Sequence, residues 1–135
     1  MTVPNNIFTL SDADIAKALD QGFLVIPNVC PEDELTRLKN DYDRLFAEER
    51  GKEKGYFHDL AGTDKEGERP TLPHVLAPDE HIPWVKKSCF VHNCEQIAQQ
   101  ILKKDEPAVF RTSHAILKPA KYGSPTPWHQ DKAYW

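Results

Sequence analysis

The chain has 135 residues, of which 39% are hydrophobic, so it can form one domain and leaves no room for a second independent one. The net charge of −4 is unevenly distributed: residues 1–69 carry 15 acidic and nine basic side chains, and residues 70–135 carry six and eight. No basic stripe suits a nucleic-acid backbone, and no apolar run is long enough for a signal peptide or a membrane span. We therefore expect neither nucleic-acid binding nor membrane insertion, while the composition leaves the oligomeric state open.

The three cysteines cannot all pair with one another and contain no C-x-x-C spacing, which argues against a disulfide framework or a zinc ribbon. Cys89, His92 and Cys94 are close in sequence, but their spacing is not that of a zinc site. The cysteine usage favours a reducing environment, so we expect a cytoplasmic location.

Two helices are predicted in the first 51 residues. Ser11 and Asp14 form a capping-box pattern before a short helix that stops at Gly22. Pro31 and the three acids after it suit the start of a second helix, whose apolar residues recur at helical spacing up to Gly51. These two helices have the clearest start and stop signals in the chain.

The remaining elements are predicted from shorter patterns. The apolar run 23–26 predicts a buried strand, and the Gly-, Pro- and charge-rich stretch 51–83 predicts a long irregular connection. A third helix is predicted over 93–102, followed by strands over 108–118 and 128–135. Helices followed by strands indicate an α+β fold in which helices support an antiparallel sheet.

The sequence His129-Gln130-Asp131 is the strongest chemical signal. In a strand, residues i and i+2 point to the same face about 6.6 Å apart, so this imidazole and carboxylate can converge on one ion. One histidine and one carboxylate are two of the three protein ligands of the facial triad that holds non-haem Fe(II). The alternative interpretation is a surface histidine beside a solvated aspartate, because such a triplet arises easily by chance.

The segment 115–135 (AILKPAKYGSPTPWHQDKAYW) resembles the phytanoyl-CoA dioxygenase family, Fe(II)- and 2-oxoglutarate-dependent oxygenases, and the segment GFLVIPNV resembles the opening of that family. The resemblance implies a double-stranded β-helix (jelly roll, cupin-like) with N-terminal helices packed on one sheet. It implies that His129 and Asp131 bind Fe(II), and that 2-oxoglutarate is the cosubstrate. The expected reaction is hydroxylation of a small organic substrate with O2.

By the same resemblance, the second histidine ligand and the arginine that binds 2-oxoglutarate come from strands beyond residue 135. We therefore expect residues 1–135 to be a single domain that forms the N-terminal part of a phytanoyl-CoA dioxygenase-like domain with an incomplete sheet. The alternative is a non-catalytic fragment or degenerate relative that lacks those two residues. The sequence does not indicate which organic molecule would be the substrate.

The resemblance also suggests contacts with 2-oxoglutarate. In the predicted strand 108–118, a period of two places Thr112 and His114 on one face and Ser113 on the other. Anchored on the Lys-Pro pair that follows, His114 falls where similar oxygenases contact 2-oxoglutarate, with Thr112 as its neighbour, and His74 in the long connection lies near another such contact. The alternative for His114 and His74 is a structural histidine.

Overall fold

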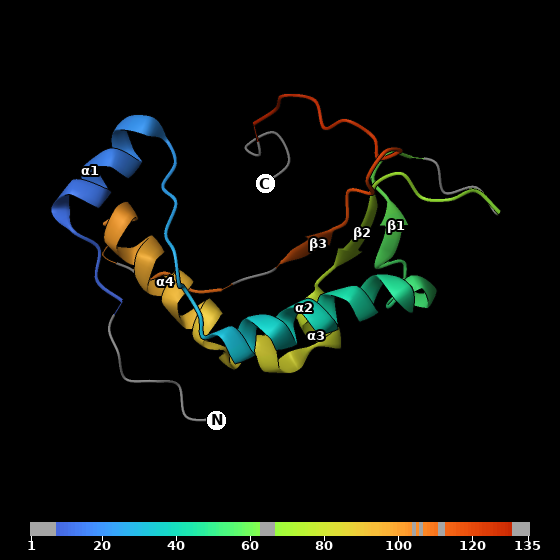
Figure 1. Cartoon of the computed structure of the whole chain (residues 1–135), viewed down its shortest axis with the longest axis horizontal. Coiled ribbons are helices and arrows are strands. Elements are labelled where there is room, and N and C mark those ends of the chain that lie inside the picture. The colour runs from blue at the N-terminus through green and yellow to red at the C-terminus, as the bar shows by residue number, and fades with distance from the viewer. Residues whose placement is uncertain (1–7, 63–66, 104, 106, 111–112, 131–135) are drawn as a thin grey trace.

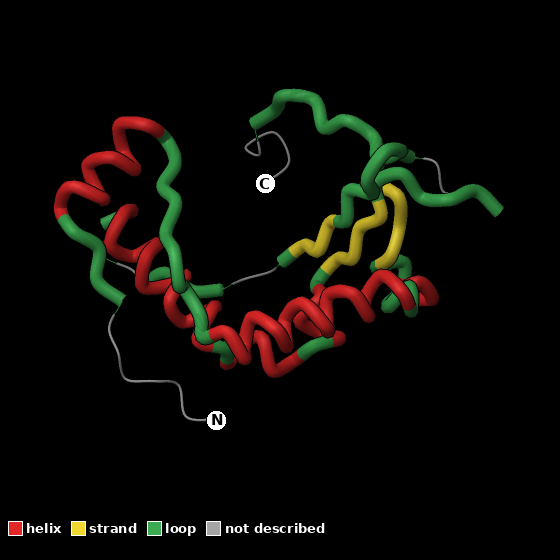
Figure 2. Tube along the Cα trace, viewed as in Figure 1, coloured by secondary structure: helices red, strands yellow, loops and turns green. Residues whose placement is uncertain are grey.

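The computed structural model describes residues 8–62, 67–103, 105, 107–110 and 113–130. Its elements in chain order are α1 (Asp12–Gln21), α2 (Glu32–Ala47), η1 (Lys52–Lys54), β1 (Phe57–Asp59), β2 (Pro73–Leu76), α3 (Pro78–His81), η2 (Pro83–Lys87), α4 (Cys89–Leu102) and β3 (His114–Ile116). The chain has a curved outline in which α1 and α4 lie together at one end and the sheet lies at the other, with α2 and α3 between them (Figure 1). Figure 2 shows that helices and loops account for most of the described chain, and that the strands are short.

The first two helices form where they were predicted. The Ser11 hydroxyl accepts a hydrogen bond from the Asp14 backbone N–H at 3.1 Å, and the Asp14 carboxylate accepts one from the Ser11 N–H at 3.3 Å, which completes the capping box. The helix ends at Gly22, whose φ of 76° is readily adopted by glycine. The second helix begins directly after Pro31. Capping chemistry was therefore sufficient to place the start of α1, whereas α2 starts after Pro31 without a side-chain cap.

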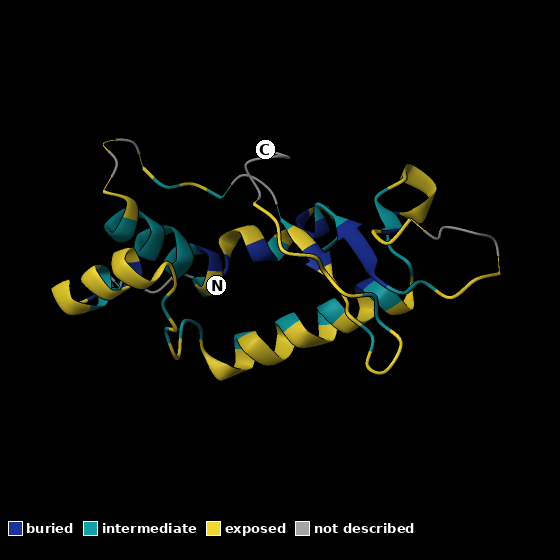
Figure 3. Ribbon diagram, turned by 90° about the horizontal axis from the view of Figure 1, so that it is seen from above, coloured by how far each residue is buried: buried dark blue, intermediate teal, exposed yellow. Residues whose placement is uncertain are grey.

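The three strands form one antiparallel sheet in the order β1-β2-β3. Alternation along the strands sends Phe57, Val75 and Ala115 to one face, which α2 covers with the buried side chain of Leu45. Val75 is fully buried, and Figure 3 shows the buried strand residues beside a helix whose outer side is exposed. The main apolar core thus lies between α2 and one face of the sheet. The partly buried residues around this core are Tyr42, Phe46, Phe57 and Ile82.

The predicted strand 23–26 is wrong for this structure. These residues have no strand assignment, and the side chains of Phe23 and Val25 are 62% and 82% exposed. Leu24 and Ile26 are half-buried, and they line an apolar groove together with residues of α4. One side of the run therefore packs against α4. The run is not a strand because a strand needs a hydrogen-bonded neighbouring strand, and the described part of the chain does not provide one.

The prediction of an irregular connection over 51–83 is also wrong in part, because this stretch contains η1, β1, β2 and α3. Both strands have only three or four residues, so neither is long enough to show a clear period of two. They form because they pair with each other and because β2 then pairs with β3, which is far away in sequence. A pattern of neighbouring residues cannot predict pairing between strands that are far apart in sequence.

The helix α4 begins at Cys89, four residues before the predicted start. The hydroxyl of Ser88 accepts from the Val91 N–H at 3.1 Å, and the Glu34 carboxylate of α2 accepts from the N–H groups of Cys89 and Phe90 at 2.9 and 2.8 Å. These contacts satisfy N–H groups that have no partner inside the helix. The Glu34 contribution comes from a distant helix, so the sequence around residue 89 alone did not reveal it.

The two predicted C-terminal strands are only partly observed. Of the strand predicted over 108–118, residues 114–116 pair with β2. The N–H groups of Ala108 and Phe110 instead donate to side chains of α4, namely Gln99 at 2.5 Å and Glu95 at 2.6 Å. Residues 128–130 have no strand assignment, and the rest of the strand predicted over 128–135 lies outside the described residues.

Helices combined with a small antiparallel sheet agree with the predicted α+β class, and α2 packs on one face of that sheet as expected. The described residues contain a single three-stranded sheet, so the jelly roll remains a prediction. Within the same described residues, no helix has both the length and the apolar character that crossing a membrane requires.

Candidate functional site

Three histidines lie side by side on the sheet face that points away from α2. In the antiparallel register His58 of β1 is directly opposite His74 of β2, and His114 of β3 lies diagonally across from His74. The ring centroids of His58 and His74 are 4.8 Å apart, and those of His74 and His114 are also 4.8 Å apart. Two of the three residues predicted to contact 2-oxoglutarate, His74 and His114, are therefore neighbours in space. The third, Thr112, lies outside the described residues.

His74 is the central and most buried member of this histidine cluster, with only 2% of its surface exposed. Burial, followed by the nearby imidazoles of His58 and His114, lowers the pKa of His74 from 6.5 to about 4. The ring is therefore neutral at physiological pH, and one of its nitrogens carries a proton while the other is an acceptor.

A hydrogen bond of 3.2 Å joins His74 Nδ1 to His58 Nε2. The other ring nitrogen, His74 Nε2, is buried and has no hydrogen-bond partner among the described residues. If His58 donates, Nε2 of His74 carries the proton and is a donor; if His74 donates, Nε2 is an acceptor. A buried polar atom without a partner is costly, so this nitrogen is a strong candidate for contact with a ligand.

Asp59, next to His58 in the same strand, points to the other face and organises the hairpin. Its carboxylate is 3% exposed and accepts hydrogen bonds from the backbone N–H groups of Ala61 at 3.0 Å, Thr71 at 2.8 Å and Leu72 at 2.9 Å. Thr71 in turn shares a hydroxyl hydrogen bond of 2.8 Å with Ser124, and its carbonyl accepts from the Ser124 N–H at 3.0 Å. The turn after β3 is thus tied to the β1–β2 hairpin.

His129, a predicted iron ligand, lies five residues beyond this attachment and is exposed. Its Nδ1 is 2.9 Å from the Pro127 carbonyl oxygen, and because a carbonyl only accepts, Nδ1 is the donor. A donated Nδ1–H of this kind is common among histidines that bind a metal through Nε2. The chemistry of His129 therefore fits a metal ligand.

The second predicted ligand, Asp131, lies outside the described residues, so the structure does not test the pair. In the described part of the chain, no three or more His, Cys, Asp or Glu side chains are grouped so that they could hold a metal ion. Cys89 and Cys94 both lie on α4, where burial is the main cause that raises the pKa of each thiol. Both thiols are therefore protonated at neutral pH, whereas a metal-bound cysteine is a thiolate.

Sequence reasoning did not identify His58. It lies in the stretch predicted to be irregular, so there was no strand period that could assign it to the same face as His74. The only local signal would have been the short run Tyr-Phe-His-Asp, in which aromatic residues favour a strand. Its place beside His74 depends on the pairing of β1 with β2.

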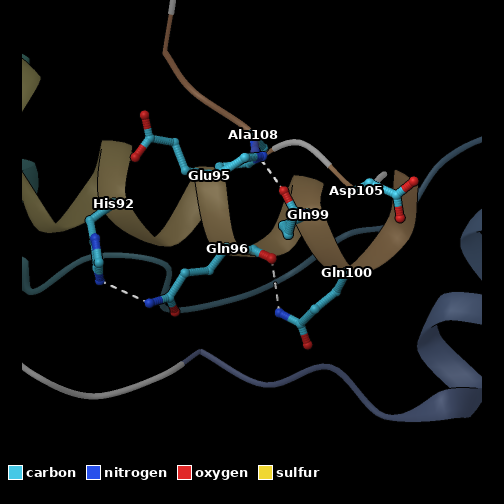
Figure 4. A pocket seen from close by; sticks show the side chains of 8 residues that line it. His92, Glu95, Gln96, Gln99, Gln100, Asp105 and Ala108 are labelled. Carbon is cyan, nitrogen blue, oxygen red and sulfur yellow. Dashed lines mark hydrogen bonds between the residues drawn. The ribbon is translucent and has the colours of Figure 1, made fainter. Parts of the chain in front are cut away.

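A hollow of about 530 Å³ lies along the polar side of α4 and is drawn in Figure 4. Its glutamines hold other parts of the chain: Gln100 accepts from the Leu10 N–H at 2.9 Å and donates to the Phe8 carbonyl at 2.7 Å, and Gln96 accepts from the Phe8 N–H at 2.6 Å. Figure 4 also shows Gln99 bonded to the backbone of Ala108. These amides fasten two segments to α4, so we assign this hollow a structural role.

The mixed helical and antiparallel architecture, with histidines gathered on the sheet face away from α2, agrees with an incomplete α+β domain. A family-model comparison gives the specific family: the model of phytanoyl-CoA dioxygenase (PhyH) matches residues 19–135. Because the match covers most of the chain, the protein belongs to the phytanoyl-CoA dioxygenase family, as its sequence predicted. Members of this family are generally dependent on Fe(II) and 2-oxoglutarate. The comparisons with curated proteins and with solved structures gave no match.

Proposed function

We propose that this chain forms part of an Fe(II)- and 2-oxoglutarate-dependent dioxygenase that hydroxylates a small organic substrate with O2. Family membership supports the reaction class. The observation that connects the proposal to particular residues is the buried Nε2 of His74, which lies beside His114 on the sheet face away from α2 and has no partner in the part of the chain that the structure describes. A ligand that accepts or donates a hydrogen bond at this nitrogen would satisfy it.

In this proposal, His129 and Asp131 hold the iron. Bound Fe(II), together with 2-oxoglutarate and O2, supplies the oxidising power that hydroxylates a C–H bond while 2-oxoglutarate is converted into succinate and CO2. His129 contributes Nε2, because its Nδ1 proton is held by the Pro127 carbonyl. Asp131 is assigned through the family resemblance alone.

The histidine cluster has a different role, which is to bind and orient 2-oxoglutarate. With a hydrogen bond from His58 to its Nδ1, His74 presents an Nε2–H donor, which suits a carboxylate oxygen. His114 lies against the same ring and can contact the same ligand, with Thr112 as its expected neighbour on the strand. Because the pKa of His74 is about 4, its ring binds as a neutral donor and keeps this role across the physiological pH range.

The test measures succinate formation from 2-oxoglutarate in the longest natural polypeptide that contains this sequence. We expect Asp131→Ala to abolish Fe(II)-dependent succinate formation, and Asp20→Ala, which removes an exposed carboxylate from α1, to leave it unchanged. A second readout is independent of turnover: under anaerobic conditions, the visible charge-transfer absorption of an Fe(II)–2-oxoglutarate complex should form in the parent protein and disappear in Asp131→Ala. Normal succinate formation in Asp131→Ala would refute the metal assignment. Absence of both signals from the parent protein would favour the alternative of a non-catalytic relative.

A further inference from the structure

A small cavity of about 160 Å³ lies between α2 and the segment that contains α3 and η2. Its lining residues are Arg37, Asp41, Arg44, Leu45, Arg50, His81, Ile82, Pro83 and Trp84. Arg37, Asp41 and Arg44 follow one another at spacings of four and three residues, which places them on one side of α2. The cavity therefore collects three guanidinium groups and one carboxylate in a small volume.

Arg37 is the least neutralised of these cations. Its guanidinium carbon lies 4.0 Å from the centroid of the Trp84 ring, which is a cation–π contact. Trp84 is itself held in place, because its indole N–H donates to Asp41 at 2.7 Å. No carboxylate among the described residues forms an ion pair with Arg37. The positive charge of Arg37 is thus positioned by an aromatic ring and left available for an anion.

The other two arginines are only partly engaged. Arg44 contacts Asp41 at 3.4 Å and Glu48 at 3.5 Å, both at the long end of ion-pair distances. Arg50 pairs with Glu48 through two of its nitrogens, Nε at 2.6 Å and a terminal nitrogen. Each guanidinium has five N–H donors, so these contacts leave donors on both residues for a further acceptor. Asp41 is the one carboxylate that lines the cavity with the three guanidinium groups, so the balance of charge there is positive.

His81 lines the same cavity, and its Nε2 is buried with no hydrogen-bond partner among the described residues. Gly51 makes this burial possible, because a Cβ at that position would lie 2.8 Å from His81 Nε2. This nitrogen therefore lies against the backbone at Gly51, and it is the three guanidinium groups that favour an anion in the cavity.

From these contacts we propose that the cavity between α2 and α3–η2 binds the phosphate group of a small ligand. Arginine recognises phosphate through bidentate hydrogen bonds, and several guanidinium groups around one cavity suit a group with oxygens on all sides better than a planar carboxylate. A cavity of about 160 Å³ can hold several water molecules and is therefore large enough for a phosphate group. It is below the roughly 300 Å³ of pockets that enclose a drug-sized ligand, so the rest of a larger ligand would lie outside.

This phosphate site is separate from the histidine cluster. Leu45, which lines the cavity, packs against the Val75 face of the sheet, whereas His74 points to the opposite face. The inference is therefore independent of the proposed dioxygenase activity.

The test is calorimetric titration of the 135-residue chain with inorganic phosphate at fixed ionic strength. Arg37→Gln should weaken binding roughly 10- to 150-fold, the loss expected for a hydrogen bond to a charged group. The matched control is Arg69→Gln, since the Arg69 guanidinium also lies over an aromatic ring, 4.2 Å from the centroid of Tyr122, but outside the cavity. Arg69→Gln should bind phosphate as the parent chain does. Arg50→Gln provides a second test in case Arg37→Gln alters the fold by circular dichroism.

Saturable phosphate binding that Arg37→Gln or Arg50→Gln weakens and Arg69→Gln preserves would support the proposal. Repeating the titration with phenyl phosphate identifies the source: tighter binding than inorganic phosphate indicates a phosphorylated metabolite, and equal binding indicates free phosphate. The proposal is overturned if phosphate does not bind, if all three variants weaken binding equally, or if acetate binds as tightly as phosphate.

Discussion

The buried His74 ring makes a quantitative prediction about pH and stability. Its pKa is about 4 in the folded chain and 6.5 as an unperturbed side chain, so between these values the unfolded chain binds one more proton. The stabilisation is complete above about pH 6.5 and is lost as the pH falls toward 4. At 1.36 kcal/mol per pKa unit, the loss in unfolding free energy is about 3 kcal/mol.

The assay is urea unfolding of the parent chain and of His74→Gln at several pH values from 7 to 4. Charged groups remote from His74 are the same in both proteins, so their contribution cancels in the difference between the two curves. We expect the parent chain to lose about 3 kcal/mol more than His74→Gln over this range. The control variant His129→Gln changes an exposed ring and should follow the parent chain.

A parallel measurement does not depend on the stability of any variant. NMR titration of the His74 ring protons in the parent chain should give a pKa of about 4. A pKa of His74 near 6.5, or identical pH dependence in the parent chain and His74→Gln, would refute the argument that burial and the two neighbouring imidazoles keep this ring neutral.

Three further predictions concern individual contacts. Ser88→Ala removes the side-chain cap of α4 and should lower the unfolding free energy by about 1 kcal/mol, whereas Ser88→Asn should retain most of it. Gly123→Ala should destabilise the turn after β3, because its Cβ would lie 2.6 Å from the Pro119 carbonyl oxygen; a melting temperature equal to that of the parent chain would contradict this. His114→Ala should raise the Michaelis constant for 2-oxoglutarate roughly 10- to 150-fold, and Ser113→Ala on the other face should not; equal effects would remove His114 from the cosubstrate site.

The parts of the fold that the sequence predicted well depend on neighbours a few residues apart. The capping box at Ser11, the stop at Gly22 and the start after Pro31 each involve contacts within one helical turn, and all three are observed. Family membership was also predictable, because the segment around His129 contains a specific short pattern and the family model matches residues 19–135. The assignment of His129 and Asp131 to iron remains a prediction.

The elements that were missed depend on partners that are distant in sequence. The strands β1 and β2 pair with each other, and β2 also pairs with β3, about 40 residues further on. The helix α4 starts early because Glu34 reaches its first turn. In contrast, the run 23–26 has strong strand propensity, yet it has no strand partner in the described part of the chain. Propensity is therefore a weak guide when pairing decides the outcome.

The histidine cluster shows most clearly the difference between what the local sequence predicts and what the pairing of strands decides. His74 and His114 were predicted one by one, from a resemblance and from strand period, and the sequence contained no indication that their rings would meet. Only the register of β1, β2 and β3 brings these two rings together and places His58 beside them. The ring of His74 is buried between the other two, so its pKa falls and its Nε2 has no hydrogen-bond partner among the described residues. The residue types come from the chain, but burial and mutual repulsion arise only when the strands pair, because both depend on what surrounds the ring in space.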